Sequence, residues 1–171
     1  VADRRGEDPW HEVDLAGLVR RAVERAGRRS ENEYVVEVQP CLVVGQSAGG
    51  WGTLALSSRN PAGVPAMIDF AGGRAGHQDI PGGVCAPDLL VKAAAKYGST
   101  ARVPLLWITT ENDSFFSPAL VQRMVDAYRA AGGNVTHRAL GPFGRDGHAL
   151  AGSDSGARIW SPLVTEFLKD R

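Results

Sequence analysis

Short apolar segments alternate with segments of helical periodicity along most of this chain. Residues 103–109 form a nearly continuous apolar run, which is typical of a strand buried on both faces. Residues 117–131 repeat apolar side chains every three or four positions, which predicts an amphipathic helix. The predicted strands are 42–45, 65–71, 103–109 and 134–140, and the predicted helices are 13–28, 47–58, 88–96, 117–131 and 159–169, with 34–38 as a short strand or an extended lead-in. This order predicts an α/β fold with a mostly parallel sheet and helices on both faces.

Length and charge limit the classes of function. The 171 residues suit one domain, and 19 basic residues balance 19 acidic ones, so the formal net charge is zero. Nucleic-acid-binding surfaces usually carry a basic excess, so we expect no nucleic-acid partner. No apolar run approaches the roughly 18 residues of a membrane span, so we expect no span. The localisation stays open between the cytoplasm and export.

The sequence gives no support for metal or nucleotide chemistry. The four histidines are dispersed, and Cys41 and Cys85 do not have the spacing of metal ligands, so we expect no metal site. Cys41 is expected to be a small buried residue at the start of a strand, and a disulfide to Cys85 stays open. No glycine-rich phosphate-binding pattern occurs, so we expect no cofactor.

Residues 45–49 read Gly-Gln-Ser-Ala-Gly and lie between a predicted strand and a predicted helix. On such a turn the hydroxyl of Ser47 is exposed beside the N–H groups of a helix N-terminus. Side chains at Gly45 and Gly49 are expected to crowd the turn, which gives both glycines a steric reason. The alternatives are a glycine-rich turn without chemistry and a Ser47 that only caps the helix.

An acid and a histidine follow two later strands. Because parallel strands end at the same edge of a sheet, Ser47, Asp113 and His148 are expected on three loops at one edge. A histidine can take the proton of a serine hydroxyl, and a carboxylate can hold the histidine ring in place. Glu111 is the main rival of Asp113, which could also cap the helix at 117–131. His137 is expected to be a surface or pairing residue.

These motifs resemble the nucleophile, acid and base loops of the α/β-hydrolase superfamily. The matching runs are Gly45-Gln46-Ser47-Ala48-Gly49-Gly50, Glu111-Asn112-Asp113 and Asp146-Gly147-His148. The chain is most similar to dienelactone hydrolase-related and prolyl-oligopeptidase-like serine esterases, with its strongest local likeness at residues 104–108. The resemblance implies a serine hydrolase that cleaves carboxylic esters through an acyl-enzyme. Its implied catalytic residues are Ser47, Asp113 and His148, with the Ala48 N–H as an oxyanion donor.

The chain also departs from these relatives. Dienelactone hydrolase uses a cysteine nucleophile, whereas position 47 is serine, which favours an esterase or peptidase-like enzyme. The early strands of the family's sheet have no counterpart here, so we expect residues 1–171 to form a single, N-terminally truncated domain with the C-terminal half of that sheet. The second oxyanion donor is then missing, and an exposed sheet edge could support an oligomer.

Two other functions stay open. One is an aminopeptidase or amidase of the prolyl-oligopeptidase type, and the other is a catalytically weak hydrolase-like domain that only binds a partner or a ligand. For an enzyme we expect a small-molecule ester or amide substrate. The glycine-rich loop at 72–83 is expected to border the substrate pocket. The candidate pocket residues are Gln46, His77, Phe115 and Phe116, and the two phenylalanines could instead belong to the core.

Overall fold

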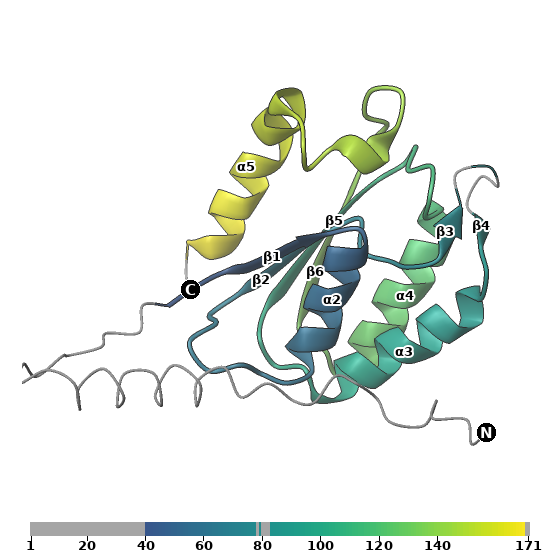
Figure 1. Cartoon of the computed structure of the whole chain (residues 1–171). Helices are drawn as coiled ribbons and strands as arrows, with labels where there is room; N and C mark the ends of the chain where they lie inside the picture. Colours follow the sequence, from purple (N-terminus) through teal and green to yellow (C-terminus); the bar gives the residue numbers. More distant parts are fainter. Residues whose placement is uncertain (1–39, 78, 80–82, 170–171) are drawn as a thin grey trace, which may run out of the picture. The chain divides into compact units, whose positions relative to one another are not determined.

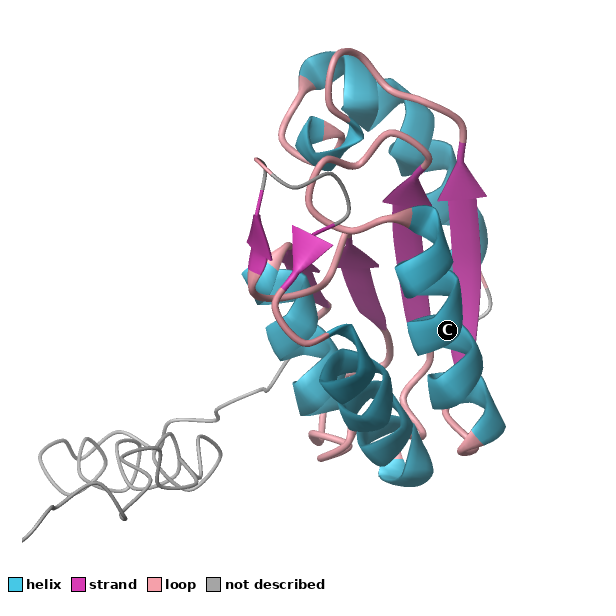
Figure 2. Ribbon diagram, turned by 90° about the vertical axis from the view of Figure 1, so that its right-hand side faces the viewer, coloured by secondary structure: helices cyan, strands magenta, loops and turns pink. Residues whose placement is uncertain are grey.

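The computed structural model describes residues 40–77, 79 and 83–169. Its main sheet contains the parallel strands β1 (Val43–Gln46), β2 (Met67–Phe70), β5 (Leu105–Thr110) and β6 (Val135–Leu140), in the order β1-β2-β5-β6. Figure 2 shows them running in one direction. The four strands predicted in this region are confirmed, with small shifts of their ends. The helix predicted at 13–28 and the segment at 34–38 lie outside the described residues.

Helices cover both faces of this sheet, as the sequence predicts (Figure 1). On one face lie α2 (Ala48–Ser57), α3 (Pro87–Thr100) and α4 (Pro118–Ala130), which connect successive strands. On the other face lies α5 (Asp154–Leu168). Since each crossover returns the chain to a parallel strand, the carboxyl ends of β1, β2, β5 and β6 meet at one edge.

The alternation of side chains along the strands divides the apolar residues into two clusters. Met67, Leu105 and Trp107 face α2, α3 and α4, where they pack with residues such as Leu54 and Met124. The residues between them, Ile68, Phe70, Leu106 and Ile108, face the other way and pack with the α5 side chains Trp160, Val164 and Phe167. Burial on both sides explains why β5 is apolar along most of its length.

In helix α4 the sequence explains which face is buried and where the helix begins and ends. Its apolar stripe of Leu120, Val121, Met124, Val125 and Tyr128 is buried, as the spacing predicts. Its first turn is capped by the hydroxyl of Ser117, which accepts a hydrogen bond from the backbone N–H of Leu120. After the helix, Gly132 has a φ of 103°, a conformation that favours glycine and ends the helix.

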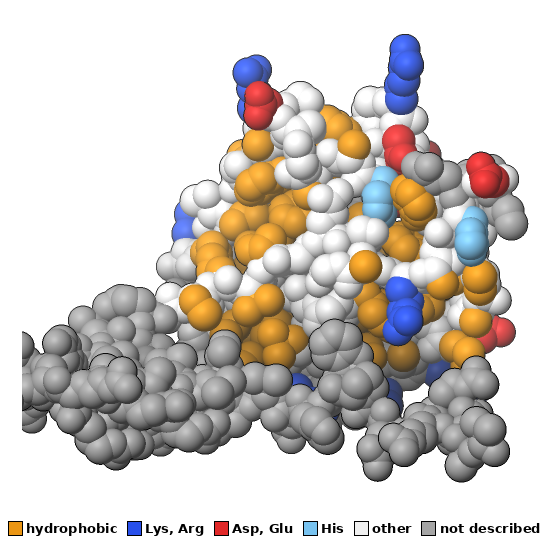
Figure 3. Space-filling view, viewed as in Figure 1, with side chains coloured by type: hydrophobic (Ala, Val, Ile, Leu, Met, Phe, Trp, Pro, Cys, Tyr) orange, Lys and Arg blue, Asp and Glu red, His pale blue; other side chains and the backbone are white. Residues whose placement is uncertain are grey.

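The outer strand β1 is less buried than its neighbours. Leu42 and Val44 keep 41% and 56% of their surface exposed. Figure 3 shows hydrophobic side chains gathered over β1 and α5 on this side of the molecule. Cys41, just before β1, is also exposed, so the prediction of a buried Cys41 is wrong; it precedes the paired part of the strand, and among the described residues no helix covers it. Cys41 and Cys85 are both free thiols.

Three local elements differ from the sequence prediction. The glycine-rich segment contains a short hairpin, β3 (Gly76–His77) and β4 (Gly83–Val84), and is not a loop throughout. Helix α5 begins at Asp154 because the hydroxyl of Ser153 accepts a hydrogen bond from the N–H of Gly156. A single 3-10 turn, η1 (Gly147–Ala149), carries His148. In the part of the chain that is described, the helices are too short or too polar to cross a membrane.

Candidate active site

Ser47 sits on a strained turn between β1 and α2. Its backbone has φ 56° and ψ −120°, a region that residues with a side chain rarely occupy. Its N–H donates to Phe70 O at 2.9 Å, and its own carbonyl accepts from Trp51 N at 2.9 Å and from Gly73 N at 3.2 Å. The Ser47 hydroxyl makes no capping hydrogen bond, so the capping alternative is not what the structure has. Three backbone hydrogen bonds therefore hold this turn and leave the hydroxyl free of a capping role.

The glycines around Ser47 differ in the space that a side chain would have. A Cβ on Gly45 would collide with the backbone of Gly49 and with the Thr53 hydroxyl, as the sequence predicts. A Cβ on Gly49 would meet nothing within 4 Å, so the prediction that Gly49 is sterically required is wrong. The close approach occurs one residue later, where a Cβ on Gly50 would meet the Asp69 carboxyl and the backbone of Gly72. Gly49 lies on the open side of the first helical turn, where space is not limiting.

The first turn of α2 presents backbone donors beside Ser47. The first hydrogen bond back to the Ser47 carbonyl comes from Trp51, so the N–H groups of Ala48, Gly49 and Gly50 have no acceptor within the helix. N–H groups at a helix N-terminus favour negative charge. The Ala48 N–H, which the sequence resemblance assigns to an oxyanion, belongs to this set.

Asp113 and His148 meet at the carboxyl ends of β5 and β6. Asp113 Oδ2 lies 2.9 Å from His148 Nδ1, and the side chains are 2% and 13% exposed. The other oxygen, Asp113 Oδ1, accepts from the backbone N–H of Phe115 at 2.8 Å and of Phe116 at 3.0 Å. Asp113 is therefore both a turn residue and the partner of the histidine. Its rival Glu111 is exposed.

The main chain of His148 is fixed from two directions. Its N–H donates to Asp146 Oδ1 at 2.9 Å. Its carbonyl accepts from Gln46 Nε2 at 2.8 Å, so a residue next to Ser47 is bonded to the loop that carries His148. The side-chain amide of Gln46, a predicted pocket residue, joins β1 to the histidine loop.

The aromatic pair next to Asp113 packs around the histidine ring. The ring centroids of Phe115 and Phe116 lie 4.4 Å and 5.9 Å from that of His148. Phe116 is only 2% exposed and belongs to the core, which is the alternative noted for it, whereas Phe115 is half-buried. His77 is exposed on the hairpin, where its Nε2 lies 3.2 Å from Cys85 Sγ. Of the expected pocket residues, Gln46, Phe115 and Phe116 contact His148, and Phe115 has the shortest distance between ring centroids.

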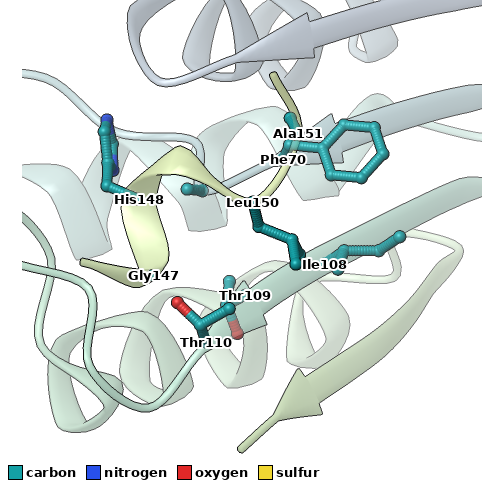
Figure 4. A pocket seen from close by; sticks show the side chains of 9 residues that line it. Phe70, Ile108, Thr109, Thr110, Gly147, His148, Leu150 and Ala151 are labelled. Carbon is teal, nitrogen blue, oxygen red and sulfur yellow. The ribbon is translucent and has the colours of Figure 1, made fainter. Parts of the chain in front are cut away.

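Gly147 lets the histidine loop approach β5 closely. A Cβ on Gly147 would collide with the hydroxyl of Thr110, which is the last residue of that strand. Figure 4 shows the small cavity beneath this turn, where Leu150 points toward Ile108 and His148 points away from that contact. Leu150 is 4% exposed and anchors the end of the turn in the apolar cluster under α5.

The sequence analysis missed one buried carboxyl near this edge. Asp69 lies in β2 beneath Gly50 and Gly72, is 0% exposed, and neither of its oxygens has a well-aligned hydrogen-bond partner among the described residues. Burial raises the pKa of Asp69 well above its usual value, and the nearby Gly72 N–H offsets only part of this effect. The signal in the sequence was an acidic residue inside a predicted strand that is otherwise apolar.

His137, by contrast, behaves as the pairing residue that its strand position predicts. It stands opposite Trp107 in the register of β5 and β6, and its Nε2 lies 2.9 Å from Thr109 Oγ1. Burial, with a smaller contribution from Arg129, lowers the pKa of His137 below its usual value. This histidine belongs to the sheet and not to the Asp113–His148 pair.

Comparison with solved structures finds α/β-hydrolases. A putative dienelactone hydrolase from Klebsiella pneumoniae has a TM-score of 0.54 at 18% identity, covering 89% of this chain and 59% of that chain. An esterase from Pyrococcus furiosus has a TM-score of 0.58 at 17% identity, covering 92% of this chain and 61% of its own. An acylaminoacyl peptidase from Pyrococcus horikoshii has a TM-score of 0.56 at 14% identity, covering 92% of this chain and 27% of its own. Neither a protein-family model nor a curated protein matches the chain.

At this level of identity the likeness concerns the fold and not the activity. The chain spans about three fifths of the length of the dienelactone hydrolase and the esterase. It has an α/β-hydrolase-like fold, of which it covers only a part.

Proposed function

We propose that this chain is a serine hydrolase that cleaves carboxylic esters through an acyl-enzyme. The observation that carries the proposal is the hydrogen bond between His148 Nδ1 and Asp113 Oδ2, on a loop bonded to Gln46 next to Ser47. A histidine held at Nδ1 by a carboxylate keeps its Nε2 available as a base. The strained turn at Ser47 supports the proposal because such strain is typical of functional sites.

The proposed reaction begins with the Ser47 hydroxyl. Its oxygen attacks the ester carbonyl while His148 Nε2 takes its proton, because an un-ionised hydroxyl is a weak nucleophile at neutral pH. Asp113 holds the Nδ1 proton and stabilises the imidazolium that forms. The negative charge that develops on the carbonyl oxygen is stabilised by the Ala48 N–H at the start of α2.

Three further proton transfers, each to or from His148, then complete the turnover. His148 returns its proton to the alcohol oxygen as the carbon–oxygen bond breaks, which leaves Ser47 acylated. A water molecule gives a proton to His148 and attacks the acyl carbonyl, and the acid product leaves as Ser47 regains its proton. Loss of one oxyanion donor typically lowers turnover by about 10²–10³-fold, so we expect the Ala48 N–H to contribute on this scale.

A fluorophosphonate probe tests the nucleophile directly. We expect it to label Ser47, as located by peptide mass spectrometry, and the Ser47→Ala variant to stay unlabelled. Ser99→Ala is a matched control, because Ser99 is an exposed helical serine whose hydroxyl bonds only Lys96 O. His148→Ala is expected to slow labelling strongly. Labelling at another residue, or no labelling of the folded chain, would contradict the proposal and favour a domain that only binds.

A second candidate is the hydrolysis of amides by an aminopeptidase or amidase. The observation that favours it is the fold likeness to the acylaminoacyl peptidase. A panel of p-nitrophenyl esters and aminoacyl anilides separates the two reactions. We expect higher kcat/KM for the esters, because an amide leaving group needs a better-assembled proton donor and oxyanion site than an ester does. Faster cleavage of the anilides would establish the second candidate instead.

A further inference from the structure

One carboxylate, Asp146, joins the loops that carry Asp113 and His148. Asp146 Oδ1 accepts from the backbone N–H of Ser114 at 3.1 Å and from that of His148 at 2.9 Å. Asp146 Oδ2 accepts from the hydroxyl of Ser114 at 2.6 Å. Ser114 directly follows Asp113, so a single side chain bonds both the neighbour of the acid and the main chain of the histidine.

Asn112, the residue before Asp113, connects the same two loops. Its Oδ1 accepts from the backbone N–H of Phe143 at 2.8 Å, and its Nδ2 donates to the carbonyls of Phe143 and Gly144 at 3.2 and 3.3 Å. Its own carbonyl accepts from the N–H of Gly147 at 3.1 Å. Asn112 and Asp146 thus connect the acid loop to the histidine loop on either side of Asp113, and Asp146 is the one bonded to His148 itself.

The two aspartates near His148 bond different parts of this residue. Asp113 is bonded to the ring nitrogen Nδ1, whereas Asp146 is bonded to the backbone N–H of the same residue. Burial alone would raise the pKa of Asp146, but the hydrogen bonds from Ser114 and His148 outweigh it and lower the pKa below the usual value. Asp146 therefore stays ionised at neutral pH, and bonds to a charged acceptor are stronger than neutral ones.

We infer that Asp146 is a positioning residue, which sets the distance between Asp113 and the His148 ring through its bonds to Ser114 and to the His148 main chain. The expected change in turnover rests on the proposed function, whereas the expected change in the position of the His148 ring does not. An error of about 1 Å in the position of a catalytic group can lower a rate by about 10²-fold. Asp146→Ala removes all three of these bonds, whereas the bonds of Asn112 between the two loops remain.

The test compares Asp146→Ala, Asp146→Asn and Ser114→Ala in the full chain. In Asp146→Asn the amide oxygen still accepts from both N–H groups, and the amide N–H₂ can donate to the Ser114 hydroxyl, so this variant is the conservative rescue. We expect Asp146→Ala to lower kcat about 10- to 100-fold with little change in KM. We expect Asp146→Asn to stay within about threefold of wild type, with Ser114→Ala between the two.

A spectroscopic measurement makes the inference independent of turnover. Nitrogen-15 chemical shifts of the His148 ring, assigned with His148→Gln, report which ring nitrogen carries the proton in the neutral form. We expect the Nδ1–H form to dominate in wild type and Asp146→Asn, and a mixture of both forms in Asp146→Ala.

The outcomes separate the two proposals. If wild type neither turns over esters nor reacts with the probe, the proposed function fails, but the ring measurement still decides the inference. A folded Asp146→Ala with the wild-type ring form would overturn the positioning role. If Asp146→Ala does not fold, Ser114→Ala decides: a partial shift toward the mixed ring form supports the inference, and an unchanged ring overturns it.

Discussion

The two halves of the candidate site are held together in different ways. The serine half, residues 45–50 and 69–73, depends on backbone hydrogen bonds and on close packing at Gly45 and Gly50. The acid–base half, residues 110–116 and 143–148, depends on side-chain hydrogen bonds made by Asn112, Asp113 and Asp146. Each half contains a buried aspartate, and these two residues show the contrast most clearly.

Asp113 receives three donors, whereas Asp69 receives none that is well aligned within the described residues. Asp69 lies within β2, whereas Asp113 lies on the loop after β5. The two carboxyls are both buried, but they differ in the N–H groups that surround them. A buried polar group is costly unless it is hydrogen-bonded, so the loop at Asp113 is the better place for a carboxylate.

The largest expected effect tests the acid–base half. Asp113→Asn keeps the size of the side chain but loses the charge that holds the His148 ring, so kcat is expected to fall by about 10⁴-fold. Steady-state ester hydrolysis and the rate of fluorophosphonate labelling measure it. Glu111→Gln is the matched control, because Glu111 is exposed on the same loop. Equal losses in the two variants would mean that Asp113 has no special part.

An Asp→Asn substitution in the serine half, at Asp69, is expected to be favourable, because it raises the stability of the fold. Burial raises the pKa of Asp69 in the fold above its value in the unfolded chain, so stability is lost as pH rises above about 3.9 toward the raised folded pKa. Asp69→Asn removes this loss and is expected to stabilise the chain at pH 7 relative to wild type. Urea unfolding at about pH 5 and pH 8 measures it. A stability of wild type that does not fall between these pH values would show that Asp69 is already charged in the fold.

A smaller effect is expected from the packing at Gly45. A methyl group there meets the backbone of Gly49, which cannot move without disturbing the turn at Ser47. Gly45→Ala is expected to destabilise the fold by about 1–3 kcal/mol and to reduce probe labelling. Urea unfolding and labelling of the same sample check both effects. An unchanged unfolding midpoint would show that the turn adapts.

The smallest effect is expected at Gly49, the residue for which steric crowding was wrongly predicted. Since space around it is open and it lies in the first turn of α2, Gly49→Ala is expected to stabilise the helix by about 0.5–1 kcal/mol. Thermal unfolding of Gly49→Ala beside Gly45→Ala gives the comparison. A loss of stability as large as that of Gly45→Ala would remove the distinction between the two glycines.

The sequence predicted the parts of the molecule that depend on periodicity and chain order. The apolar stripe of α4 and the alternation of strands and helices along the chain follow from the spacing of side chains. The arrival of Ser47, Asp113 and His148 at one sheet edge follows from parallel topology. The bonds of Asp146 and Gln46 could not be predicted in this way, because they depend on how two loops approach each other. The hairpin at 76–84 has strands too short to show alternation.

Helix α5 contributes no group to the proposed chemistry, yet the site depends on it. Leu150, two residues after His148, is anchored in the apolar cluster that Trp160 and Phe167 cover. Clipping the chain between residues 151 and 153 would release that cover and loosen the attachment of the turn that carries His148. Carboxy-terminal trimming is therefore expected to inactivate this protein as a direct mutation of the proposed site would, although the helix removed supplies none of the proposed catalytic residues.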